Sequence, residues 1–223
     1  MGRAKIARKS TSIDMTAMCD VAFLLLSFFI MATKQKPPEV LAVQPPNSVS
    51  SKAAPDKSIL ITLTKDGRTF LTLGDDTKKA DILADINKTK ALNLSDADLQ
   101  RWNKQEFIGA PLGQIKSMLE SGKDLNPATL PGIPTDSTNN EMIDWVKSIT
   151  NTYAGSDQKD LEKMLLVKGD NDVKYPVFRQ IKEAFKKNEI YKFRIVTNGE
   201  APPAGSELAK SIAAGTGGDE NNK

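Results

Sequence analysis

The longest apolar run of the chain lies near its start, from Met15 to Thr33. It is nineteen residues long, and a helix of that length rises about 28 Å, close to the hydrocarbon thickness of a bilayer. The pattern therefore predicts a transmembrane helix over residues 15–33.

A polar stretch follows over residues 34–57, rich in Pro, Lys, Gln and Ser. The pairs Pro37-Pro38 and Pro45-Pro46 favour an extended tether with polyproline character. Within it, Val40–Val43 is a short apolar segment that is either plain linker or a strand that pairs when a partner is present.

From Ser58 the pattern changes to short β-branched runs. Ile59–Thr64 and Arg68–Leu73 flank Asp66-Gly67, a turn signal that predicts a β-hairpin. Apolar positions then recur at helical spacing over residues 78–92, which predicts a helix.

Residues 91–159 are predicted to be a mostly helical insert. Ser95 and Asp98 resemble a capping box that starts a helix reaching about Phe107. Pro111 suits the first turn of another helix. Residues 126–140 predict a long exposed loop, and residues 141–153 a further helix.

The last patterned segment predicts a strand–helix–strand unit. Residues 163–168 form the first strand, Pro176 opens the helix, and residues 191–196 alternate as a half-exposed second strand. Such a unit is consistent with a parallel pair joined by a crossover. The tail, residues 199–223, has the composition of a disordered segment.

The expected fold class is thus a single-pass transmembrane helix with the N-terminus inside, followed by a small α+β domain at residues 58–198.

The distribution of charge supports this orientation of the helix. The first fourteen residues carry Arg3, Lys5, Arg8 and Lys9 against Asp14, a net of +3 that equals the charge of the whole chain. This balance indicates a cytoplasmic tail rather than a nucleic-acid surface.

The domain is therefore expected on the outer side of the membrane. A cleaved signal peptide is the alternative for any N-terminal apolar run. The Asp within the run, and the absence of a convincing small-x-small cleavage site near Met31–Thr33, argue against it.

Composition excludes most enzyme chemistry. The chain has no His, and its single Cys is Cys19, within the apolar run. A Ser-His-Asp triad, Cys-His catalysis, His-based zinc sites and thiolate metal clusters are all excluded. We expect no cofactor, no metal and no enzymatic activity.

Asp20 stands out because it is ionisable and lies within the apolar run, four residues before its midpoint. A charged Asp near a helix centre costs roughly 2.5–3.5 kcal/mol on the insertion scale. The eight Val, Phe, Leu and Ile residues that follow within the run return roughly 2.4–4.8 kcal/mol, so insertion is still favourable.

Asp20 also shares one side of the predicted helix with other polar residues. At 100° per residue, Ser12, Thr16, Asp20 and Ser27 fall within about 80° of one another. A narrow polar stripe on an apolar helix points toward a protein partner or a water-filled path. Asp20 is then either a proton carrier or a group that snorkels or pairs structurally with a neighbouring helix.

Several segments together resemble the ExbD/TolR family of biopolymer transporters. The first is Ile13–Val21, with its Asp14-Met-Thr and Asp20-Val pairs followed by apolar residues. The others are Leu165–Asp170, Tyr175–Val177 and Phe193–Thr197, which resemble the family's C-terminal module. The similarity covers roughly residues 10–90 and 160–198, whereas the insert is longer than family members usually carry.

The resemblance implies the minor subunit of a motor driven by the proton-motive force in the bacterial inner membrane. Asp20 would be alternately protonated and ionised, with Thr16 and Ser27 as supporting polar contacts. The implied partners are a polytopic ExbB-like subunit, a TonB-like protein, a second copy of the chain and the lipid bilayer. The domain would be periplasmic and would pass force toward the outer membrane.

Two other functions stay open at this point. The chain is also consistent with a TolR-like subunit of the Tol-Pal system, which maintains the envelope. A passive membrane-anchored scaffold is the third possibility.

Overall fold

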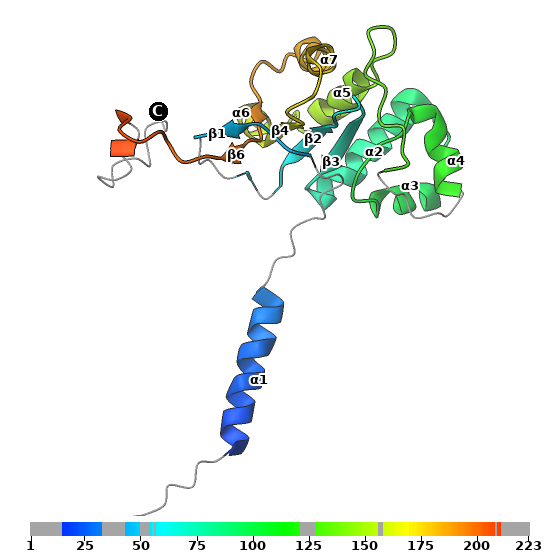
Figure 1. Cartoon of the computed structure of the whole chain (residues 1–223). Coiled ribbons are helices and arrows are strands. Elements are labelled where there is room, and N and C mark those ends of the chain that lie inside the picture. Colours follow the sequence, from blue (N-terminus) through cyan, green and yellow to red (C-terminus); the bar gives the residue numbers. More distant parts are fainter. Residues whose placement is uncertain are drawn as a thin grey trace, which may run out of the picture. The chain divides into compact units, whose positions relative to one another are not determined.

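The computed structural model describes residues 15–32, 43–49, 54–55, 57–120, 128–155, 158–207 and 209–210. The chain divides into two compact units, Met1–Pro38 and Glu39–Lys223. The predicted basic tail, Ser12, Thr33 and residues 211–223 lie outside the described residues. In the first unit, helix α1 runs from Met15 to Ala32 (Figure 1). Within the described residues, no helix has the combined length and apolarity of a membrane span.

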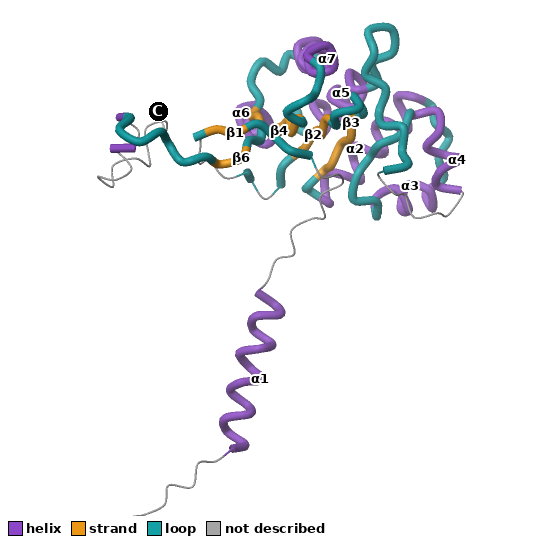
Figure 2. The backbone as a smooth tube through the Cα atoms, viewed as in Figure 1, coloured by secondary structure: helices purple, strands orange, loops and turns teal. Residues whose placement is uncertain are grey.

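A mixed four-stranded sheet forms the centre of the second unit (Figure 2). Its strands are β2 (Ile59–Leu63), β3 (Thr69–Leu73), β4 (Leu165–Gly169) and β5 (Arg194–Ile195), in the order β3-β2-β4-β5. β2 pairs antiparallel with β3 and parallel with β4, and β4 pairs parallel with β5. The predicted hairpin and the predicted parallel pair are both confirmed.

One face of this sheet carries the hydrophobic core. Ile61 lies opposite Leu71 on one side and Val167 on the other, and Ile59 lies opposite Leu73 and Leu165. Because directly paired residues point to the same face of a sheet, these apolar side chains form one continuous surface. All six are buried in the main core cluster.

The helices of the second unit are α2 (Asp76–Lys90), α3 (Asp96–Asn103), η1 (Leu112–Gln114), α4 (Ile115–Glu120), α5 (Met142–Thr152), α6 (Gln158–Met164) and α7 (Tyr175–Lys187). α2 packs against α3 and α5, and α5 packs against α7. At the start of α3, the predicted capping box is confirmed: the Asp98 backbone N–H donates to Ser95 Oγ, and the Ser95 N–H donates to the Asp98 carboxylate.

The insert is part of the core rather than a separate lobe. Trp102 of α3 and Trp145 of α5 meet edge to face, with ring centroids 5.6 Å apart, and both are buried. The buried Lys79 of α2 donates to the Gln105 carbonyl, and burial lowers the pKa of its ammonium group. Removing the insert would therefore expose α2.

The insert also continues the sheet beyond β3. Leu71 and Ile108 exchange backbone hydrogen bonds, and Ile133 forms a bridge with Thr69. The loop predicted over 126–140 is described from residue 128 onward. There the prediction that it is exposed is confirmed only in part: residues 128–129 and 136–139 are exposed, whereas Leu130 and Ile133 are buried against the domain.

Two other boundaries differ from the sequence prediction. The strand predicted from Lys163 begins at Leu165, because α6 occupies residues 158–164. The strand predicted over 191–196 is reduced to Arg194–Ile195. In both cases the alternation of side chains fits a strand over more residues than form backbone pairs with a neighbouring strand.

We predict that Gly109→Ala destabilises the domain. A Cβ at residue 109 would overlap the ring of Phe70, which is fully buried and packs edge to face on Phe107. Overpacking of this kind costs about 1–3 kcal/mol, measurable by urea unfolding of the full chain followed by tryptophan fluorescence.

Gly113→Ala is the matched control, because a Cβ there has no neighbour within 4 Å. We expect its unfolding midpoint to stay near that of the wild type. Equal midpoints for the two variants would contradict close packing between Gly109 and Phe70.

Candidate functional site

The candidate site residues of the first unit lie on helix α1. Asp20 is the only charged residue between Met15 and Ala32. Thr16 is four residues before it and Ser27 seven after it, so all three fall within about 40° around the helix axis. The helical backbone thus brings Thr16, Asp20 and Ser27 to one side, as the sequence predicted.

Most of the other side chains of α1 are large, apolar and exposed. Phe23 is 67% exposed and Ile30 is 68% exposed, and the neighbouring Leu, Phe and Met side chains are similar. An exposed apolar surface of this extent marks contact with another protein or with lipid. Asp20 is therefore a single carboxylate on a surface that is otherwise suited to an apolar environment.

A second candidate site joins the start and end of the domain. Strand β1 (Asn47–Ser48) pairs parallel with β6 (Asn198–Gly199). The Asn198 side-chain amide also donates to the Pro45 carbonyl at 3.0 Å. Two segments that are about 150 residues apart in sequence therefore form one small sheet (Figure 2).

Asp170 holds the same segment from the turn after β4. Its carboxylate accepts from the Gln44 backbone N–H at 3.2 Å, and the Asn171 N–H donates to the Gln44 carbonyl at 2.9 Å. The Asp170 carboxylate accepts hydrogen bonds from the backbone N–H groups of Asp172 and Gln44, and these bonds hold its pKa below the ordinary value. Val43, just before this contact, is buried.

Residues 43–49, called the docked segment below, belong to the region that the sequence predicts to be a tether. The sequence signal for this contact is weak. The apolar segment that offers a possible strand ends at Val43, whereas the two residues that pair are Asn47 and Ser48. Residues 33–42, between α1 and this segment, lie outside the described residues.

Within the described ranges, no three His, Cys, Asp or Glu side chains gather as a metal site would require. The turn at Gly169–Asp172 instead uses its carboxylates for local contacts: Asp170 accepts backbone N–H groups and Asp172 pairs with Lys65 at 3.0 Å.

These features define a class: an α+β domain preceded by an apolar helix that carries one carboxylate. A family model described as "Biopolymer transport protein ExbD/TolR" matches residues 7–200, so the chain belongs to the ExbD/TolR family. Proteins of this family are transport motor subunits and not enzymes. Comparisons with curated proteins and with solved structures gave no significant match.

We predict that Asp170→Ala releases the docked segment. The variant loses the acceptor for the Gln44 N–H, so exchange of the amide hydrogens that the docked segment has, at Gln44 and residues 47–49, should accelerate in the full chain, while β2 and β4 keep their protection. Asp172→Ala is the matched control, because the side chain it removes pairs with Lys65 and does not contact Gln44. Equal acceleration in both variants would contradict the assigned role of Asp170.

The same contact predicts a pH dependence. Because the pKa of Asp170 is lowered in the folded chain, its stabilising contribution is complete at neutral pH and is lost as the pH falls through that lowered pKa. After correction for the intrinsic pH dependence of exchange, protection of residues 44–49 should fall in the wild type below about pH 4. In Asp170→Ala, protection should not change over that range, and a parallel loss in the variant would argue against Asp170 as the titrating group.

Proposed function

We propose that the chain is a motor subunit that uses the proton-motive force to energise TonB-dependent transport across the outer membrane, with Asp20 as proton carrier. The observation that carries this proposal is the family match over residues 7–200, which includes α1 with its one carboxylate. Thr16 and Ser27 support Asp20 by hydrogen bonds or water contacts along the same side of the helix.

The proposal requires that residues 15–33 cross the inner membrane, with residues 1–14 in the cytoplasm and the domain in the periplasm. Its support is the basic N-terminal tail, the exposed apolar side chains of α1 and the family match. Residues 34–57 would then be the linker, residues 58–198 the periplasmic domain, and residues 199–223 a tail.

Proton transfer at Asp20 would couple to motion through its change of charge. Ionised Asp20 favours a polar, hydrated position, whereas neutral Asp20 is compatible with an apolar wall. One charge that moves through 100 mV gains about 2.3 kcal/mol. Alternating protonation can therefore bias the position of α1 within a ring of ExbB-like subunits, and the domain would pass the resulting force to a TonB-like protein.

A second copy of the chain fits this arrangement. One carboxylate per helix would allow two copies inside the ring to alternate between proton entry and release. The support for this homodimer is the resemblance to the family and the exposed apolar surface of α1.

We predict that Asp20→Asn abolishes energised uptake, because an amide keeps the size of the side chain but cannot ionise. Uptake of a receptor-bound substrate should fall to the level of cells that lack the chain, while expression and copurification with the polytopic partner stay normal. Normal uptake by this variant would contradict the proposal, and normal uptake without leakage of periplasmic proteins would favour a passive scaffold.

Two matched sets of variants complete the experiment. Asp20→Glu keeps an ionisable group and should retain part of the activity. Thr16→Ala and Ser27→Ala should each reduce uptake by about fivefold, the effect of losing one hydrogen bond. Leakage of periplasmic proteins measured in the Asp20→Asn strain separates the two family roles: leakage with normal uptake indicates a TolR-like function.

A further inference from the structure

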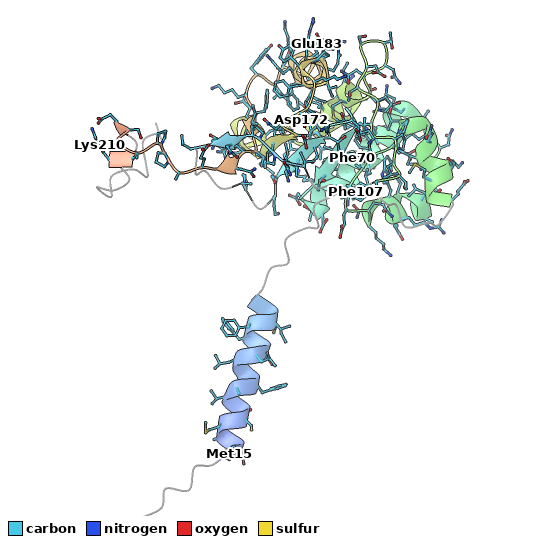
Figure 3. All side chains as sticks on the ribbon, in the orientation of Figure 1. Met15, Phe70, Phe107, Asp172, Glu183 and Lys210 are labelled. Carbon is cyan, nitrogen blue, oxygen red and sulfur yellow. The ribbon has the colours of Figure 1, made fainter. Side chains whose placement is uncertain are left out.

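The outer side of α7 carries an open groove of about 340 Å³ between the helix and residues 190–193. Its polar lining is Tyr175, Arg179, Lys182, Glu183, Lys186 and Tyr191. In Figure 3, Glu183 lies at the outer surface of α7, at the periphery of the domain. A second groove of about 310 Å³ shares Phe193 with the first and adds three cations, Lys163, Lys192 and Arg194, and one acidic residue, Glu162.

This surface, called the α7 face below, is strongly basic. Between Lys174 and Ile195 the chain has seven Lys or Arg residues and two Glu residues, a net of +5. One of the two acidic groups, Glu183, is paired with Arg179 at 3.2 Å. Lys182, Lys186 and Lys192 are exposed on the same surface.

Exposed tyrosines border these cations. Tyr175 is 65% exposed and Tyr191 is 72% exposed, which is unusual for large side chains that have an apolar ring and a polar tip. Phe193 packs beneath them between Phe178 and Phe185, at centroid distances of 6.2 and 5.0 Å. Packed aromatic rings therefore lie under the α7 face, and its Tyr and Lys side chains suit the interface between a bilayer and water.

We propose that the α7 face docks onto the anionic phospholipid headgroups of the membrane that anchors the chain. The inference rests on the proposed anchor. Ten residues separate Ala32 from Val43, and this length of chain reaches at most about 40 Å, so the domain never leaves the neighbourhood of the headgroups. This high effective concentration favours lipid over a diffusing acidic protein segment as the occupant.

Docking gives the domain a resting position at the membrane surface. Each Lys or Arg near an anionic surface raises the docked population by about fivefold, and several together outweigh the loss of orientational freedom. Binding of this kind is reversible and weakens with salt, so force on the domain can detach it without breaking its core.

The test uses the full chain in lipid nanodiscs. Cys19→Ser and Lys187→Cys place one spin label at the end of α7, outside the lining of the groove. A small constant fraction of nickel-chelating lipid relaxes the label only when it approaches the headgroups. We expect strong relaxation in discs that contain phosphatidylglycerol, weak relaxation in pure phosphatidylcholine, and loss of the difference in high salt.

Charge variants make the test specific. Lys182→Glu with Lys186→Glu removes two cations of the α7 face and should reduce the docked population at least about 25-fold, to the level of neutral discs. The matched pair Lys88→Glu with Lys116→Glu makes the same charge change on α2 and α4 and should leave the relaxation unchanged.

The outcomes separate the two proposals. A chain that does not copurify with the discs contradicts the proposed anchor and the docking together. A chain that copurifies but shows equal relaxation in both lipids contradicts the docking alone. Binding of polyglutamate to the chain, without docking on anionic discs, would instead identify an acidic protein as the occupant and overturn the lipid proposal.

Discussion

The parallel pairing of β2 with β4 is the interaction on which the rest of the domain depends. It joins residues 59–63 to residues 165–169, so the hairpin at the start of the domain and the strand–helix–strand unit at its end share one sheet. Because of that pairing, Ile61 lies between Leu71 and Val167, and the sheet presents a continuous apolar surface to the core. Long-range parallel pairing requires closure of a large loop, and the insert forms that loop.

The insert contributes more than chain length. Its helices α3 and α5 pack on α2 and bury Trp102 and Trp145 together. Ile108 and Ile133 of the insert extend the sheet past β3. An edge strand with unpaired backbone groups is prone to association, and these two bridges cover part of the β3 edge. The enlarged domain therefore stays one folded unit.

The functional interpretation depends on two contrasting environments of acidic side chains. Asp20 lies on a helix whose large apolar side chains are exposed, where a change of charge has a large energetic effect. Asp170 lies in a polar turn, where backbone N–H groups stabilise its ionised form. The first suits transfer of a proton under a membrane potential, and the second holds the docked segment at neutral pH.

Local patterns in the sequence determined the apolar helix with Asp20, the hairpin, the capping box at Ser95 and the strand–helix–strand unit, because each depends on residues close together in the chain. The side of α1 shared by Thr16, Asp20 and Ser27 follows equally from helical spacing. Only the tertiary structure decided that β2 pairs with β4, that Ile133 of a loop is buried, and that Asn47 pairs with Asn198. Those contacts join residues far apart in sequence, and their energies depend on burial and backbone pairing that no local pattern records.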